Sequence, residues 1–229
     1  MKIARAGLLL AGLLTFATAT TADAAVVITF DNSGTALGNV SYDGLGGPLV
    51  GTGITFDIVE VDNGMVDTTL DCTGCVLNFV TGNNTFEGGN IATFGAGGTF
   101  VITGVITDPG AGNVVVAAGT LLTGSFSGPT PALATIGQGN TVTITGSGFD
   151  QKNAALLRYF GFSQDDFIYA STDITGINCD GNLNNGFNCA VSEADVVNTQ
   201  QAPEPGSLVL FGMALIGAGR AARRRFAQQ

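Results

Sequence analysis

Short runs of apolar and β-branched residues recur along the middle of the chain, and each run is bounded by glycine, asparagine, aspartate or proline. Residues 141–145 read Thr-Val-Thr-Ile-Thr, so the valine and the isoleucine fall on one face of an extended strand. Glycines at 95–98 predict a hairpin turn between two further strands. The strands predicted in this way cover residues 26–30, 49–61, 76–80, 91–94, 99–107, 114–117, 121–126, 141–145, 167–170 and 191–197.

One stretch of the middle region is predicted to be helical. Residues 152–160 are rich in alanine and leucine, they stop before Gly161, and Asp150 is a candidate N-cap. Roughly ten strands with one short helix favour an all-β fold, a single antiparallel β-sandwich or jelly roll, over alternating β-α units. Residues 128–131 are the best candidate for an internal linker, but few apolar runs follow them, so one domain is predicted.

The start of the chain departs from this pattern. A basic beginning, an apolar run and then small residues up to Ala22-Asp23-Ala24 have the form of a secretory signal peptide over residues 1–24. Cleavage is expected after Ala24 or Ala25, with Ala19 as an alternative. The expected partners at this end are the Sec machinery and signal peptidase.

The other end of the chain contains an uncharged apolar run, residues 206–219. The run is short for a membrane span, but an arginine stem can lie in the apolar layer, so a span over about 206–222 becomes feasible. Positive charge after a span stays on the cytoplasmic side, which places the body, residues 25–201, outside the inner membrane. The positive charge comes from Arg220, Arg223, Arg224 and Arg225.

The triplet Pro203-Glu204-Pro205 stands directly before this run. The order of triplet, apolar run and basic end in residues 202–229 resembles the PEP-CTERM sorting signal of bacterial surface proteins, which the membrane protease-transpeptidase exosortase recognises and removes. The resemblance implies an exosortase-like partner, transient attachment to the inner membrane, and a final place at the cell surface or in the extracellular matrix of a Gram-negative cell that produces exopolysaccharide. A permanent anchor that is never cleaved is the alternative.

The body is much more acidic than the whole chain, whose formal net charge is −10. Of the eighteen acids all but Asp23 and Glu204 lie in the body, and of the eight basic residues only Lys152 and Arg158 do, which gives the body −14. Such a charge argues against binding to nucleic acid or anionic lipid. It attracts divalent cations, although resistance to self-association at a crowded surface is the simpler interpretation.

Four cysteines in an exported protein predict two disulfides, and local pairing of Cys72 with Cys75 and of Cys179 with Cys189 is favoured among three connectivities. The first pair also has the spacing of thiol-redox sites. A reactive cysteine needs a helix N-terminus or a cationic neighbour, whereas this pair has an acidic neighbour, Asp71, and strand-like residues after it, so a structural bond is preferred.

A weak calcium candidate lies between the second pair of cysteines. Asp180, Asn182 and Asn184 alternate as in the first half of a calcium-binding loop, but the twelfth position is Val191 rather than a bidentate glutamate. A disulfide-closed turn is therefore the preferred interpretation, and no cofactor is predicted.

These observations together favour an exported structural or adhesive protein of the cell surface or biofilm matrix, without catalytic residues. The first alternative is a carbohydrate-binding module of the exopolysaccharide matrix, although the chain has no tryptophan and three tyrosines to serve as sugar platforms. The second is a secreted hydrolase that acts through acidic residues such as Asp165 and Asp166. The absence of histidine excludes the Ser-His and Cys-His mechanisms.

Overall fold

The computed structural model describes residues 27–34, 36–62, 67–135, 141–164, 169–183 and 185–199, except for the side chains of residues 131–135 and 169. Residues 25–201 form one compact unit. The described residues form eleven strands and one short helix, which confirms the predicted antiparallel all-β class. These are β1 Val27–Asp31, β2 Asn39–Tyr42, β3 Pro48–Asp62, β4 Asp67–Gly88, β5 Ile91–Phe94, β6 Gly97–Asp108, β7 Val114–Phe126, β8 Thr130–Thr135, β9 Thr141–Lys152, α1 Ala154–Tyr159, β10 Tyr169–Asn182 and β11 Gly186–Thr199.

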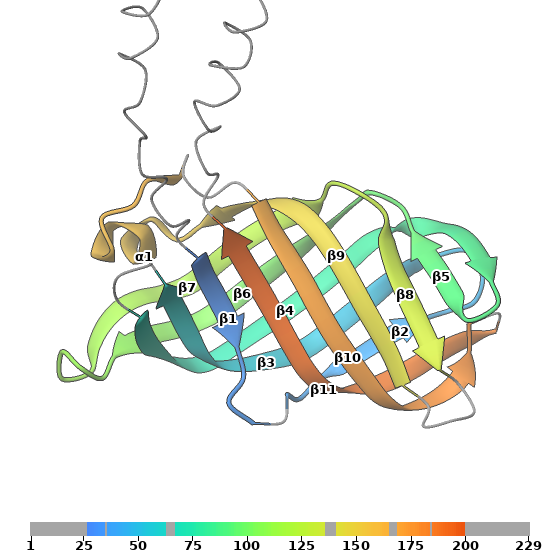
Figure 1. The fold of residues 1–229 in the computed structure, drawn as a ribbon, viewed down its shortest axis with the longest axis horizontal. Helices are drawn as coiled ribbons and strands as arrows, with labels where there is room; N and C mark the ends of the chain where they lie inside the picture. Colours follow the sequence, from blue (N-terminus) through green and yellow to red (C-terminus); the bar gives the residue numbers. More distant parts are fainter. Residues whose placement is uncertain are drawn as a thin grey trace, which may run out of the picture. The chain divides into compact units, whose positions relative to one another are not determined.

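All eleven strands belong to one sheet, and every pairing is antiparallel. The pairings lead from β1 through β3, β4, β6, β7, β9, β10 and β11 and return to β1, so the sheet closes on itself. Figure 1 shows β9, β10 and β11 crossing in front of β3, β4 and β6. The predicted sandwich or jelly roll is not established, because the strands form one continuous sheet rather than two.

The predicted hairpin between residues 91–94 and 99–107 is wrong. β5 pairs with β4 and β8, whereas β6 pairs with β4 and β7. β4 is 22 residues long and pairs with β6 and then with β5 along the same edge. The N–H of Gly82 donates to the carbonyl of Gly95 at 3.1 Å, and the N–H of Gly95 donates to the carbonyl of Asn83 at 2.8 Å. The glycines therefore interrupt a continuing ladder and do not reverse the chain.

Two short strands are missing from the sequence-based assignment. β2 was not predicted, and the proposed linker at 128–131 overlaps the start of β8, which pairs with β5 and β9. Both strands are brief and contain few large apolar residues, so the alternating pattern is too short to identify them.

The helix is also shorter than predicted, and its N-cap is Asn153 rather than Asp150. The Oδ1 atom of Asn153 accepts a hydrogen bond from the N–H of Ala155 at 2.9 Å. Asp150 lies on β9, where its carboxylate accepts hydrogen bonds from the Lys152 ammonium at 2.8 and 3.0 Å. Both side chains are fully buried. Burial raises the pKa of Asp150 and lowers the pKa of Lys152, and their mutual attraction opposes both shifts.

Glycine has a second role in this sheet besides making turns. Gly51 on β3 lies directly opposite Phe79 on β4, and a Cβ atom on Gly51 would lie 2.0 Å from the phenyl ring. Phe100 has the same relation to Gly124, with a distance of 2.3 Å. The ring of Phe126 lies 5.9 Å from that of Phe79 and 5.2 Å from that of Phe100. The phenyl rings of the core thus occupy the space that side chains at these glycines would take.

Replacement of Gly51 by alanine tests this packing. Gly51→Ala is expected to lower the free energy of unfolding by about 1 to 3 kcal/mol, because the added methyl group overlaps the ring of Phe79. Gly34→Ala is the matched control, since no atom lies within 4 Å of its added carbon. Urea unfolding of both variants measures the effect. An equal loss of unfolding free energy in the two variants would show that overlap with the Phe79 ring is not its cause.

Candidate functional site

Three acidic side chains lie together on the outer face of β10 and β11. Asp173 on β10 is directly opposite Asp195 on β11, and Thr175 is directly opposite Glu193. The residues between them on both strands are buried in the core. Because side chains alternate along a strand, these carboxyl and hydroxyl groups all point away from the core.

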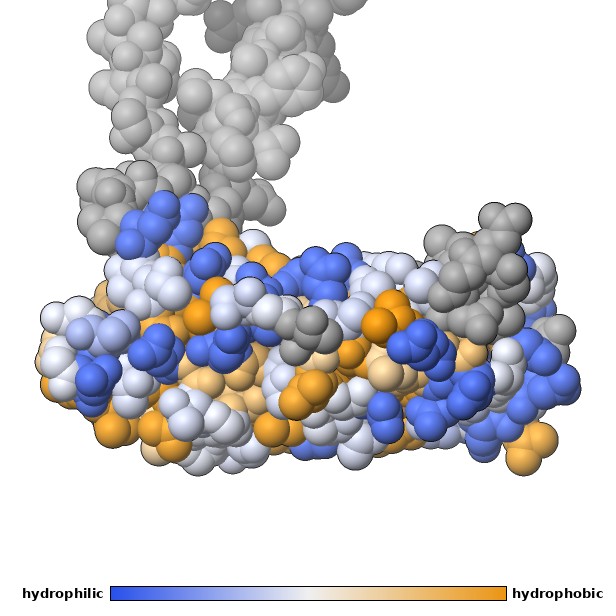
Figure 2. All heavy atoms as spheres, turned by 90° about the horizontal axis from the view of Figure 1, so that it is seen from below, coloured by the Kyte–Doolittle hydropathy of each residue, from blue (hydrophilic) through white to orange (hydrophobic). Residues whose placement is uncertain are grey.

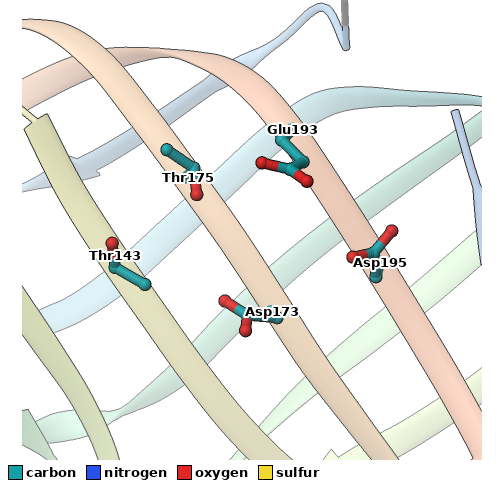
Figure 3. A pocket seen from close by; sticks show the side chains of 5 residues that line it. All are labelled: Thr143, Asp173, Thr175, Glu193 and Asp195. Carbon is teal, nitrogen blue, oxygen red and sulfur yellow. The ribbon is translucent and has the colours of Figure 1, made fainter. Parts of the chain in front are cut away.

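The same residues line a pocket on the surface of the sheet. Its volume is about 130 Å³, and Thr143 of β9 completes the lining. Figure 3 shows the five side chains on one side of the sheet, projecting from three neighbouring strands. Carboxylates accept hydrogen bonds, and threonine hydroxyls donate or accept them. The pocket is therefore suited to polar groups such as hydroxyls or amines.

The ionisation of Asp195 is strongly perturbed. Burial raises its pKa to about 7, and a hydrogen bond with Asp31 of β1 together with the charges of Asp31, Glu193 and Asp173 acts in the same direction. Like charges directly opposite each other on neighbouring strands destabilise a sheet. The proton on Asp195 partly relieves this repulsion near neutral pH.

Basic side chains do not line the pocket. The described ranges contain two basic residues, of which Lys152 is paired with Asp150 in the interior and Arg158 lies on α1. In the part of the chain that the structure describes, no group of three acidic, cysteine or histidine side chains is arranged to hold a metal ion. The raised pKa of Asp195 indicates that proton binding relieves part of the negative charge at this pocket.

Sequence reasoning missed this cluster. The spacing of Glu193 and Asp195 already indicates that both lie on one face of a strand. Their meeting with Asp173 and Asp31 depends on which strands pair and in which register, and the sequence contains no local signal for either.

The predicted bond between Cys72 and Cys75 is present, inside β4. The register of β4 against β6 shifts between Thr73 and Val76, so the chain bulges between the two cysteines, both of which are buried. The helix that the structure describes begins elsewhere, at Ala154. This environment supports a structural bond rather than a thiol-redox site.

The predicted bond between Cys179 and Cys189 is also present, and it joins β10 to β11 near the turn between them. Asp180 pairs with Asn188 in the ladder of this hairpin. The side chain of Asn182 accepts a hydrogen bond from the N–H of Asn185 at 3.0 Å. Two of the three calcium candidates thus belong to a disulfide-closed hairpin.

Other predicted site residues lie outside the described residues. None of the described helices is long and apolar enough to cross a membrane, and the segment predicted to span it, residues 206–222, is not described. The other predictions outside the described ranges concern the signal peptide at residues 1–24, Asp165, Asp166, Asn184, Pro203, Glu204, Pro205, Arg220, Arg223, Arg224 and Arg225.

The raised pKa of Asp195 predicts a pH dependence of stability. Its carboxyl group ionises near pH 3.8 when unfolded and near pH 7 when folded, so its contribution is fully present below pH 3.8 and is lost as pH rises to about 7. Asp195→Asn is expected to flatten this loss and to stabilise the fold above pH 7 by about 1 kcal/mol, because solvent screens a group that is only partly buried.

Urea unfolding between about pH 4 and pH 8 measures this dependence. Asp71→Asn is the matched control, because it removes one exposed acid from β4, outside the pocket. If wild type and Asp195→Asn lose stability equally with rising pH, the assignment to Asp195 is wrong.

Comparison with known proteins gives one match, which lies outside the described residues. The PEP-CTERM protein-sorting motif matches residues 201–225 and confirms the resemblance predicted from the triplet, the apolar run and the arginines. No curated protein and no solved structure matches the chain. The motif marks the chain as an exported, surface-directed protein that is processed by exosortase-type machinery.

Proposed function

We propose that the body, residues 25–201, is a structural or adhesive component of the cell surface or of the extracellular polymer matrix. The observation that carries this proposal is the sorting motif at residues 201–225. Two disulfides in the body support it, since such bonds persist outside the cytoplasm. A formal charge of −14, from sixteen acids and two bases, suits a protein that must stay dispersed at a crowded surface.

The proposed route uses both ends of the chain. A signal peptide over residues 1–24 starts export through the Sec machinery and is removed by signal peptidase. The segment at about 206–222 then stays in the inner membrane with its arginines on the cytoplasmic side until an exosortase-like enzyme removes it. This route accounts for the charge distribution, because six of the eight basic residues lie in the two ends.

The intact mass of the protein from the cell surface and from the medium tests this route. We expect a chain that begins near residue 25, lacks the apolar run, and gains two hydrogens for each of its two disulfides on reduction. Replacement of Pro203, Glu204 and Pro205 together by alanine is expected to leave the tail in place and the protein in the membrane fraction.

The matched control replaces Gln228 and Gln229 by alanine, which changes the same tail outside the triplet and should leave processing intact. A mature mass that runs to Gln229 would reject sorting and identify a plain membrane anchor. If the triplet variant is processed at the wild-type rate, cleavage of the tail does not depend on the Pro-Glu-Pro triplet.

The pocket on β9, β10 and β11 supports a second function, binding of carbohydrate. Its carboxyl and hydroxyl groups can form hydrogen bonds with sugar hydroxyls, and its charge favours neutral or amino-bearing polymers over polymers rich in uronic acid. The pocket thus supplies polar contacts, although the sequence offers few aromatic platforms.

A glycan array that includes neutral, amino-bearing and uronate-bearing polymers tests this second function. Glu193→Gln is expected to reduce binding to neutral and amino-bearing polymers by roughly tenfold, in line with the loss of one charge-assisted hydrogen bond. Asp71→Asn removes an equal charge outside the pocket and should leave binding unchanged. An array without binding would remove carbohydrate recognition from consideration.

The proposal assigns the body no catalytic role. The acidic residues named for a hydrolase, Asp165 and Asp166, are adjacent in sequence and lie outside the described residues. The pocket acids are a separate group, on β10 and β11. The raised pKa of Asp195 is accounted for by burial and by repulsion from the neighbouring acids.

A further inference from the structure

The interior of the sheet holds an ion pair formed by Asp150 and Lys152 of β9. Hydrophilic residues are spread over the face of the molecule drawn in Figure 2, where water surrounds them. Among the residues that the structure describes, Asp150 and Lys152 are the only charged ones that are buried, and their side chains are fully removed from solvent. A buried ion pair is seldom more stabilising than apolar residues of similar volume, so stability alone does not account for this pair.

The two side chains are in direct contact and lie on a well-fixed piece of backbone. The Nζ atom of Lys152 lies 2.8 and 3.0 Å from the two carboxylate oxygens of Asp150. Gln164 bonds to the backbone of both residues, because its Oε1 atom accepts from the N–H of Lys152 at 2.8 Å and its Nε2 atom donates to the carbonyl of Asp150 at 3.3 Å. An amine and a carboxyl group held together in this way have a very high effective concentration.

The surroundings of the pair favour the uncharged forms of both groups. On β7, Gly124 lies opposite Asp150 and the buried Leu122 lies opposite Lys152. Burial raises the pKa of Asp150 and lowers the pKa of Lys152, although the attraction between their charges opposes both shifts. A lysine amine that has lost its proton in an apolar environment is a nucleophile, whereas an ammonium is not.

We propose that the side chains of Asp150 and Lys152 join in an amide bond after the body has folded. The uncharged Nζ atom of Lys152 attacks the carboxyl carbon Cγ of Asp150, and a bond forms between these two atoms. The bond from Cγ to the hydroxyl oxygen breaks, and this hydroxyl leaves with a proton of the nitrogen as water. The reaction consumes no oxidant, reductant or other reactant, and it does not depend on the sorting route.

The amide bond removes two charges from the core at once. The net charge of the body stays the same, because one acid and one base are lost together. When pH leaves the range in which both groups of an ion pair are ionised, the remaining charge is buried without compensation, which destabilises the fold. An amide has no such charge, so the bond makes the core of an exported protein insensitive to the pH outside the cell.

Mass spectrometry and amine labelling of the mature protein, purified from the exporting cells, test the proposal. We expect the mass after reduction of the disulfides to be lower than the sequence mass by one water. Lys152 is the one lysine of the body. After reduction and denaturation, an amine-reactive acylating reagent should label the N-terminal amine and leave Lys152 unlabelled. Tandem mass spectra should show no separate fragments from backbone cleavage between residues 150 and 152, because the amide bond closes a ring there.

Asp150→Ala removes the carboxyl group and should restore both the full mass and the labelling of Lys152. Asp71→Asn is the matched control, since it removes an exposed acid from β4 and should keep the bond. Wild type alone decides the matter if Asp150→Ala fails to fold, because a full mass with a labelled Lys152 overturns the proposal. A succinimide at Asp43-Gly44 or Asp180-Gly181 would also remove one water, but it would leave Lys152 reactive, and that result overturns the proposal as well.

Discussion

Three phenylalanines fill the interior of the closed sheet at positions where neighbouring strands carry glycine. Phe100 has two such neighbours, because a Cβ atom at Gly124 or at Gly148 would lie 2.3 or 2.7 Å from its ring. Phe126 lies against Gly146 in the same way, at 2.7 Å. Tight interiors tolerate neither extra atoms nor gaps, so the ring and the missing side chain must occur together. The glycines lie on β3, β7 and β9, and the rings that pack against them lie on β4, β6 and β7. This packing therefore joins β3 and β4 to β7 and β9 in one core.

Local features of this fold could be predicted from the sequence, whereas features that depend on strand pairing could not. The alternating residues 141–145 and the cysteine spacings contain their own signal, and the corresponding strand and disulfides are present. The turn assigned to residues 95–98 failed because two strands share one edge of β4. Asp150 resembles an N-cap in sequence, but burial with Lys152 two residues later on the same strand face gives it a different partner. A glycine beneath a phenyl ring looks the same in sequence as a glycine in a turn.

The candidate functional residues divide in the same way, into those with a local sequence signal and those that only strand pairing brings together. The sorting motif is linear, so the triplet, the apolar run and the arginines could be identified without any knowledge of the fold. The acidic pocket is not linear, because Asp173 and Asp195 are 22 positions apart and meet only through the register of β10 with β11. Acids directly opposite each other destabilise a sheet, so side-chain preferences alone would not predict the pairing of Asp173 with Asp195. Burial is the main cause of the raised pKa of Asp195, and the charge of Asp173 makes a smaller contribution in the same direction.

A closed sheet also limits where the protein can meet other molecules. Its interior holds the phenylalanines and the Asp150–Lys152 pair, so contacts depend on outward side chains and on the few open edges. Acids dominate the outer face of β10 and β11, whereas residues 109–149 are neutral. Repulsion between acidic bodies therefore opposes most approaches. The net negative charge of the body therefore opposes uncontrolled association between copies.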